Sequence, residues 1–299
     1  TRNRRCIFLQ IGLTLSGGGV KGAAHIGALI ALEEEKIKIS AISGTSSGSI
    51  VAALYACGYT PREIYYIFKK YCSCITDYNH MIPFKMLGTI FTGKVKLKSL
   101  AKGKNIEYIV NYFASKKGII DITGCLIPIA IPAVDIVNGE IIYYLSKRID
   151  VLNRENTTSF KDNPSYILGG RLSDIIRAST AFPGVFEPKQ IKKHLLVDGG
   201  LKVNSPVSIL NKLKQNNEKL MVVYFEKIDN NKVPNNIVET SVKAIDIMSH
   251  GINSDEINQA DYKIDIESRN VSLLDMSKID YMVNLGYRKT KEYISKYLK

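Results

Sequence analysis

Gly44-Thr45-Ser46-Ser47-Gly48 follows the apolar run at residues 37–42 and leads into an alanine-rich segment. A G-x-S-x-G turn is typical of a nucleophile elbow, in which the central serine stands at a tight corner between a strand and a helix. The flanking glycines keep side chains from clashing and leave the serine oxygen exposed. The pattern makes Ser46 the first candidate nucleophile, although five residues with three fixed positions also recur by chance.

A second unit of strand, glycine turn and helix precedes the elbow. Residues 7–15 are apolar and short enough for a buried strand, and Ser16-Gly17-Gly18-Gly19-Val20-Lys21-Gly22 follows them. Residues 23–35 have the pattern of a helix. The helix after the elbow is expected over residues 49–56, with Gly58 as its C-cap. Two successive βα units imply parallel strands with helices covering the sheet.

The rest of the chain continues the mixture of helices and strands. Thr60-Pro61-Arg62-Glu63 combines a threonine N-cap, a proline and a glutamate in a capping box, which predicts a helix to about Tyr71. Asn138-Gly139 separates two strand-like runs and predicts a hairpin. We expect strands at 126–137, 140–146, 195–197 and 220–225, and helices at 173–178, from 204 onward, at 237–249 and at 281–298. With no repeat or linker between two halves, we expect one domain over residues 7–299, preceded by a remnant or tail at 1–6.

Composition favours a globular protein of 299 residues, of which 45% are hydrophobic and 23% charged. The longest apolar stretch, residues 126–137, is too short and too interrupted for a membrane-spanning helix. An odd number of cysteines without zinc-site or C-x-x-C spacing indicates buried or free thiols in a reducing compartment; they are Cys6, Cys57, Cys72, Cys74 and Cys125. We therefore expect a cytoplasmic protein that associates peripherally with membranes, and secretion is left open.

The chain is basic, with 41 Lys and Arg, 28 Asp and Glu and a formal net charge of +13. This favours anionic partners, although a general bias toward lysine explains the excess equally well. Residues 78–106 contain no acidic residue, and lysines there alternate with apolar side chains. This basic insertion fits an anionic lipid interface, and it fits equally well an ordinary insertion whose apolar side packs on the core.

An acyl-transfer site needs a nucleophile, a base and donors for the oxyanion of the tetrahedral intermediate. Ser46 begins a helix, where free N–H groups stabilise developing negative charge. Gly17, Gly18 and Gly19 end the neighbouring strand, so their backbone could approach a substrate oxygen closely. The alternative is a nucleotide site: the spacing from Gly17 to Gly22 fits G-x-G-x-x-G, but residues 40–43 offer no acid for a ribose and the phosphate-binding G-x-x-x-x-G-K-[ST] pattern is not matched.

The base is less obvious. Histidine would be the usual partner of the serine, but none of the four histidines has a recognisable loop signal, and each is better explained as a core or surface residue; they are His25, His80, His194 and His250. Asp198 ends a short strand and is followed by two glycines, so its carboxylate could lie at the same sheet edge as the elbow. A carboxylate can accept the serine proton, but it is a weak base unless its surroundings raise its pKa.

The order of these blocks resembles that of the patatin-like phospholipases. The blocks are Ser16 to Gly22, Gly44 to Gly48 and Asp198-Gly199-Gly200, and the segment Ala178-Ser179-Thr180-Ala181-Phe182-Pro183 with Phe186 and Pro188 resembles the stretch that precedes the family's aspartate. The resemblance covers about residues 11–210. Lys21 is a small departure, because the family more often has arginine there.

The resemblance implies a three-layer α/β/α fold with a mainly parallel central sheet. It also implies a dyad of Ser46 as nucleophile and Asp198 as base, an oxyanion hole from Gly17, Gly18 and Gly19, and an elbow flanked by Gly44 and Gly48. The implied activity is lipid acyl hydrolysis of the phospholipase A or lysophospholipase type, through an acyl-serine and without metal or cofactor.

Expected partners are a phospholipid or another acyl-ester lipid and an anionic membrane surface, with no nucleic acid. Two other functions stay open: a lipid-surface binding module whose hydrolase site is vestigial, and a neutral-lipid esterase or acyltransferase on the same site. Neither the head group nor the oligomeric state follows from the sequence.

Overall fold

The protein is described from a computed structural model. The structure describes residues 9–72, 99, 101–149, 164–214, 217–225, 233, 234, 240, 243, 244, 247, 253–268, 271 and 275–298. Several expectations fall outside these residues: the tail at 1–6, most of the basic insertion at 78–106, most of the helix expected at 237–249, and His80 and His250.

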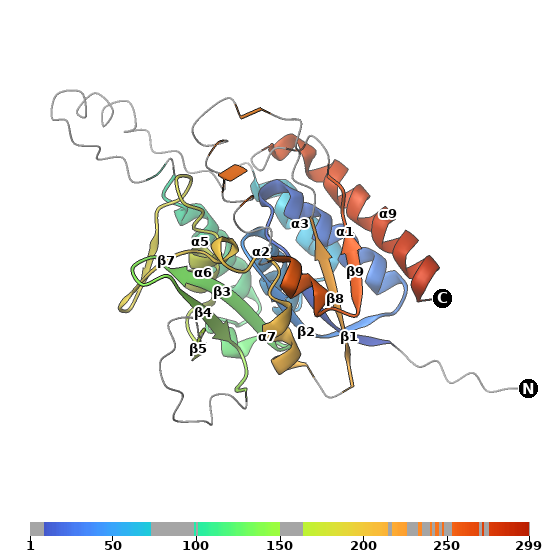
Figure 1. The fold of residues 1–299 in the computed structure, drawn as a ribbon, viewed down its shortest axis with the longest axis horizontal. Coiled ribbons are helices and arrows are strands. Elements are labelled where there is room, and N and C mark those ends of the chain that lie inside the picture. The colour runs from blue at the N-terminus through green and yellow to red at the C-terminus, as the bar shows by residue number, and fades with distance from the viewer. Residues whose placement is uncertain are drawn as a thin grey trace, which may run out of the picture.

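The described chain begins with two successive βα units, and further helices follow before the next strand (Figure 1). The strands are β1 Gln10–Leu15, β2 Lys38–Gly44, β3 Ile129–Asp135, β4 Glu140–Leu145, β5 Ser165–Leu168, β6 Lys189–Ile191, β7 His194–Asp198, β8 Lys219–Tyr224 and β9 Tyr262–Asp265. The α-helices are α1 Ala23–Glu34, α2 Ser47–Ala56, α3 Pro61–Tyr71, α5 Lys104–Lys116, α6 Leu172–Ser179, α7 Val207–Leu213 and α9 Ile279–Tyr297. Short 3-10 turns are η1 Gly19–Gly22, η3 Ile122–Gly124, η5 Gly199–Leu201 and η6 Met276–Lys278.

Within the described residues, nine strands form one sheet whose main path is β5-β4-β3-β2-β1-β8-β9. The central strands β3, β2, β1, β8 and β9 run parallel, and β4 turns back against β3 through the hairpin predicted at Asn138-Gly139. Leu15, the last residue of β1, lies opposite Gly44 of β2 and Val223 of β8. The carboxyl ends of these strands therefore meet at one edge, where the two glycine-containing turns of the sequence must lie side by side.

Alternate residues of the central strands face two different helical layers. Leu13 and Leu15 of β1 belong to the large core beneath α1 and α2, whereas Gly12 faces Leu210 of α7. In β8, Val222 packs in the smaller cluster with α7. Buried on both faces, these strands are mainly apolar, as parallel strands covered by helices are, and the buried hydroxyls of Thr14 and Ser43 form a hydrogen bond with each other at 2.9 Å. The fold is thus the expected α/β fold, with a mainly parallel sheet between helices.

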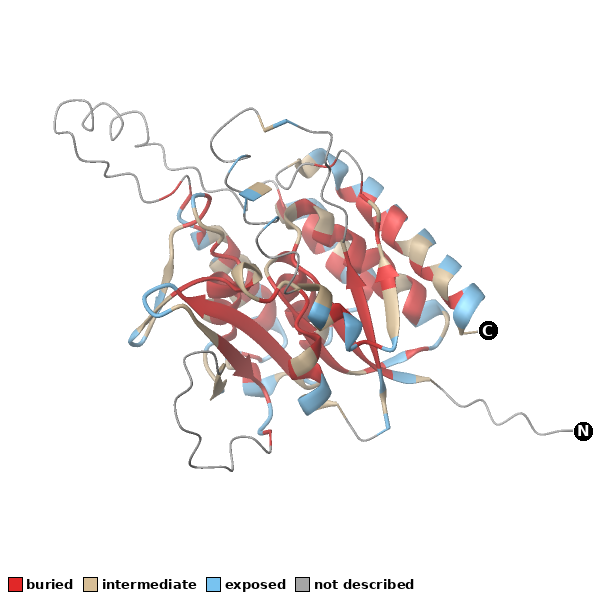
Figure 2. Ribbon diagram, in the orientation of Figure 1, coloured by how far each residue is buried: buried red, intermediate tan, exposed pale blue. Residues whose placement is uncertain are grey.

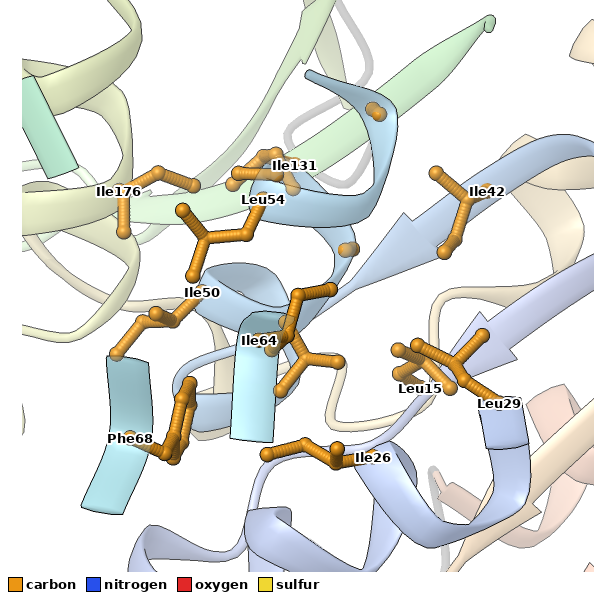
Figure 3. Packing of buried hydrophobic residues seen from close by; sticks show 14 of the residues in the cluster. Leu15, Ile26, Leu29, Ile42, Ile50, Leu54, Ile64, Phe68, Ile131 and Ile176 are labelled. Atoms are coloured by element: carbon orange, nitrogen blue, oxygen red, sulfur yellow. The ribbon is translucent and has the colours of Figure 1, made fainter. Parts of the chain in front are cut away.

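Burial follows the same layers: in Figure 2 the strands at the centre of the sheet are largely buried, the strands at its margins are partly exposed, and the outer helices keep an exposed side. Figure 3 shows side chains of β1, β2 and β3 packed against helical side chains of α1, α2, α3 and α6. The labelled residues are Leu15, Ile26, Leu29, Ile42, Ile50, Leu54, Ile64, Phe68, Ile131 and Ile176. This packing fixes α2, and with it the elbow, against the sheet.

Helix α9 crosses α1 at backbone contact. A Cβ on Gly286 would collide with the carbonyl oxygen of Ala24, and one on Gly27 would collide with that of Val283. Lys291 of α9 also pairs with the carboxylates at the end of α1. The negative charge at the end of α1, unfavourable for its own helix dipole, is therefore partly offset by a lysine of a neighbouring helix.

Most predicted elements are confirmed. The capping box of Thr60 and Glu63 forms as expected, and Gly58, with φ of 86°, follows the end of α2. Helix α2 begins at Ser47, earlier than the predicted residue 49, because the helix starts at the elbow itself. Helix α5 and strands β5, β6 and β9 were not predicted. No described helix is both long and apolar enough to cross a membrane.

Candidate active site

Ser46 occupies a strained backbone position between β2 and α2. Its φ of 52° and ψ of −124° lie outside the regions that most residues adopt, as a nucleophile elbow requires. The glycines on either side are required by contact: a Cβ on Gly48 would collide with the carbonyl oxygens of Leu15 and Ser16, and one on Gly44 would lie 2.6 Å from the carbonyl oxygen of Gly48. The elbow therefore packs directly on the end of β1.

The glycine loop after β1 lies beside this elbow. A Cβ on Gly17 would lie 3.1 Å from the Cβ of Ser46, so the two backbones approach closely. The Gly17 N–H donates to the carbonyl oxygen of Asn204 at 3.1 Å. Within the described part of the chain, the N–H groups of Gly18 and Gly19 have no hydrogen-bond partner. Of the three glycines expected in the oxyanion hole, Gly17 thus has its N–H occupied, and Gly18 and Gly19 have theirs free.

Strand β7 brings Asp198 to the same edge. Strand β2 pairs with β3 only at Ile129 and Ala130. Further along, β7 pairs antiparallel with β3, with Asp198 opposite Ala133, while β4 occupies the other edge of β3. Because β7 takes the edge of β3 that β2 leaves, it ends beside the elbow, so sheet pairing brings Asp198 to Ser46 across the 151 residues between them.

The Asp198 carboxyl is fully buried, and burial raises its pKa from the ordinary value of 3.8 to about 7. Two contacts oppose the effect of burial: the Ser46 hydroxyl and the Gly200 N–H, which donates to Oδ1 at 2.8 Å. Among the described residues, Oδ2 has no hydrogen-bond partner of normal geometry. The Ser46 hydroxyl is thus near enough to lower the pKa of the Asp198 carboxyl, although the two do not form a hydrogen bond of normal geometry. Long or poorly aligned hydrogen bonds are common in active sites without a bound substrate.

The segment at residues 178–183 lies between the two candidate catalytic residues. The Ser46 N–H donates to Oγ of Ser179 at 3.3 Å, and the Asp198 N–H donates to the carbonyl oxygen of Ala181 at 3.1 Å. One short stretch at the end of α6 therefore fixes the backbone of both. These two hydrogen bonds give a physical reason for the segment at residues 178–183 to precede Asp198 in the sequence.

The two described histidines are engaged elsewhere. His25 is fully buried, its Nε2 lies 2.7 Å from the carbonyl oxygen of Ser16, and burial lowers its pKa to about 4. His194 pairs through Nδ1 with Oδ2 of Asp135 at 2.7 Å. It stands four residues before Asp198 on β7, about 13 Å along the strand. Neither contacts Ser46 through a hydrogen bond in the described structure, so Asp198 is the titratable group beside the nucleophile.

Residues 13–211 match the family model described as patatin-like phospholipase. The chain belongs to the patatin-like phospholipase family. The match includes the glycine loop, the elbow, Asp198 and Asn204, so it covers the whole of the candidate site.

Two curated relatives of this patatin-like chain show how far the likeness extends. The chain is 30% identical to YqhO of Bacillus subtilis (strain 168) over 205 residues, which are 66% of this chain and 65% of YqhO. It is 27% identical to lysophospholipase NTE1 of Meyerozyma guilliermondii over 209 residues, 68% of this chain and 12% of that protein. The aligned part thus covers less than two thirds of either relative.

Solved structures resemble the patatin-like fold at low sequence identity. VipD from Legionella pneumophila is 15% identical with a TM-score of 0.45, and the match covers 96% of this chain and 67% of that one. A chain of the complex of full-length SpcU with full-length ExoU, from the type III secretion system of Pseudomonas aeruginosa, is 14% identical with a TM-score of 0.49. That match covers 97% of this chain and 52% of the other.

One contact of the patatin-like site did not follow from the sequence. Asn204 was assigned only to the start of a helix, yet its carbonyl oxygen occupies the Gly17 N–H and its side-chain Nδ2 donates to the Gly17 carbonyl oxygen at 3.3 Å. The available signal was its place six residues after Asp198, in the turn before Pro206, but nothing local connects that turn with Gly17.

Proposed function

We propose that this chain is a lipid acyl hydrolase that cleaves the ester of a phospholipid or lysophospholipid through an acyl-Ser46 intermediate. Family membership supports a lipid ester as the substrate class. The name of the relative NTE1, a lysophospholipase, supports the lysophospholipid as the first substrate to test. Ser46 is the nucleophile, Asp198 is the base, and the N–H groups of Gly18 and Gly19 form the oxyanion hole.

The observation that carries the proposal is the environment of Asp198. An ordinary carboxylate is too weakly basic to take a proton from a serine hydroxyl. Burial raises the pKa of Asp198 to about 7, close to the pH at which a general base is most effective.

In the acylation step, Oγ of Ser46 forms a bond to the ester carbonyl carbon as its proton passes to the Asp198 carboxylate. The carbonyl π electrons move to the oxygen, and the resulting oxyanion accepts hydrogen bonds from the Gly18 and Gly19 N–H groups. Collapse of the tetrahedral intermediate breaks the bond to the alcohol oxygen. Asp198 returns its proton to that oxygen, and the glycerol-bearing alcohol leaves.

Deacylation repeats the sequence with water. Asp198, again a carboxylate, takes a proton from the water as its oxygen attacks the acyl carbon, and the same N–H groups stabilise the second oxyanion. Breaking the bond to Oγ releases the fatty acid, and the proton on Asp198 returns to Ser46. The dyad is regenerated, and every bond change is completed by the residues of the site.

The test measures fatty-acid release from a lysophospholipid in the wild type and in two variants. Ser46→Ala removes the nucleophile, and Asp198→Asn keeps the shape and the acceptor for the Gly200 N–H but cannot take a proton. Both should lose at least about a thousandfold in kcat with unchanged circular dichroism. Retained activity in Ser46→Ala would overturn the proposal, and so would a wild type that binds the lipid but releases no fatty acid.

We also infer that the substrate is reached at an anionic membrane surface, since the chain carries a net charge of +13. Lys102 and Lys104, which adjoin Arg177 and the end of α6 near the elbow, are exposed. Binding to vesicles that contain phosphatidylserine should weaken as salt rises from about 0.05 to 0.5 M, because the Debye length shortens. Binding that is equal on neutral vesicles and insensitive to salt would contradict this.

A further inference from the structure

Gly17 and Asn204 are joined by two reciprocal hydrogen bonds. The Gly17 N–H donates to the Asn204 carbonyl oxygen at 3.1 Å, and Nδ2 of Asn204 donates back to the Gly17 carbonyl oxygen at 3.3 Å. The first bond uses only the backbone of Asn204. The second depends on its side chain, and it is the one that a substitution can remove.

The side-chain bond fixes more than one carbonyl group. The carbonyl of Gly17 and the N–H of Gly18 belong to the same planar trans peptide and point in opposite directions. A donor that holds the carbonyl therefore also sets the direction of the Gly18 N–H. With glycines on both sides, this peptide has few steric barriers of its own against rotation, since glycine accepts most backbone angles.

Asn204 is itself held from both sides. Oγ1 of Thr45, one residue before the nucleophile, donates to the carbonyl oxygen of Val203 at 2.9 Å. Oγ of Ser43 in β2 donates to the carbonyl oxygen of Pro206 at 2.8 Å. The turn that carries Asn204 is thus hydrogen-bonded to β2 and to the elbow. Through Asn204, it fixes the position of the glycine loop relative to the elbow.

The Asn204 side chain also lies against both glycine turns of the site. Its Oδ1 occupies the space that a Cβ on Gly17 would need, and it lies 3.2 Å from where a Cβ on Gly200 would be. Oδ1 of Asp198 lies 3.1 Å from that same point beside Gly200. The Asn204 amide therefore lies between the glycine loop that contains Gly17 and the turn at Gly200 that follows Asp198.

We propose that Asn204 is a positioning residue for the oxyanion hole, whose side-chain amide holds the Gly17–Gly18 peptide so that the Gly18 N–H faces the developing oxyanion. This rests on the proposed function, because an oxyanion hole matters only if Ser46 attacks an ester. The role is distinct from that of Gly18, which contacts the substrate oxygen. It predicts an effect on the transition state with little effect on substrate binding.

The experiment compares Asn204→Ala and Asn204→Asp with the wild type. Both lose the Nδ2 donor, and Asp also places a carboxylate oxygen against the Gly17 carbonyl oxygen, which favours rotation of the peptide. We expect plateau kcat for a lysophospholipid to fall about 10- to 100-fold in Asn204→Ala and further in Asn204→Asp, with KM changed less than about threefold, as for partial loss of an oxyanion donor. Asn211→Ala, at an exposed position on α7, is the control and should keep full activity.

A trifluoromethyl ketone analogue of the lysophospholipid separates positioning from packing. Its adduct with Ser46 carries an oxyanion, so its affinity should fall in parallel with kcat/KM, while an ether analogue without a carbonyl should bind unchanged. If Asn204 only filled space, Asp, the closest match in shape, would be nearly as active as the wild type and Ala would be worse. That order, or equal losses of affinity for both analogues, would overturn the proposal.

Folding and the proposed function are checked separately. Thermal melts show whether either Asn204 variant is folded, and the Asp variant, matched in volume, serves if Ala does not fold. Fatty-acid release by the wild type and by Asn211→Ala shows that the enzyme is active. If these are active and the Asn204 variants equal them, the positioning role fails while the proposed function stands; if Ser46→Ala is active, the proposed function itself fails.

Discussion

Asp198 is expected to destabilise the fold at the pH where its proposed role as a base requires it to be ionised. Burial raises its pKa from 3.8 to about 7, so between these values the native protein holds a proton that the unfolded chain releases. Stability therefore falls as pH rises through this window. At about 1.4 kcal/mol for each pH unit, ionised Asp198 costs the native state about 4 kcal/mol once pH exceeds 7.

Asp198→Asn removes this cost. The amide keeps an oxygen for the Gly200 N–H and never ionises. The variant should therefore gain stability relative to the wild type as pH rises, by about 3 kcal/mol between pH 5 and pH 8, with no further gain above pH 8. An inactive variant that is more stable than the wild type is the signature of a strained catalytic group.

Urea unfolding at pH 5, 6, 7 and 8 measures this difference, followed by tyrosine fluorescence because the chain has 17 tyrosines and no tryptophan. Asp275→Asn is the control. The pKa of Asp275 is lowered by its hydrogen bonds with Ser277, so it is ionised in both states across this range and its effect should not change with pH. If the difference in unfolding free energy between Asp198→Asn and the wild type were the same at all four pH values, the raised pKa of Asp198 would be refuted.

Three further expectations concern the pH profile, the helix crossing and the capping box. In the wild type, kcat/KM should rise about tenfold per pH unit below pH 7 and level off above it, because Asp198 must lose its proton to act; a midpoint near pH 4 in a pH–rate series would contradict this. Gly286→Ala should lower the unfolding free energy by about 3 kcal/mol or more in urea titrations, since its Cβ would collide with the Ala24 carbonyl oxygen. Thr60→Ala should cost about 1 kcal/mol in the same assay by removing the acceptor for the Glu63 N–H, and kcat should not change.

The elements of the candidate site were predictable where the requirement is local. The glycines at 44 and 48 are demanded by a turn of five residues, and the short strand that ends at Asp198 is marked by the glycines after it. Parallel pairing then brings the carboxyl ends of β1 and β2 to one edge without further information. The elbow pattern was therefore sufficient to nominate Ser46, and the resemblance to the patatin-like phospholipases paired it with Asp198.

What the sequence could not supply depends on contacts between distant residues. Asn204 meets Gly17 across 187 positions, and no pattern near either residue signals the pairing. The pKa of Asp198 depends on complete burial, which only the packed structure determines. Helix α5 was not predicted, and its first residues overlap the end of the expected basic insertion; its buried residues Ile106, Val110 and Phe113 lie at helical spacing.

Mass spectrometry can detect the proposed covalent intermediate on Ser46 directly. The wild type is incubated with a fluorophosphonate or quenched in acid during lysophospholipid turnover, then digested and sequenced. We expect a phosphonyl or acyl adduct on Ser46, absent from Ser46→Ala and much slower to form in Asp198→Asn. An adduct on another residue, or fatty-acid release with no adduct on Ser46, would contradict it.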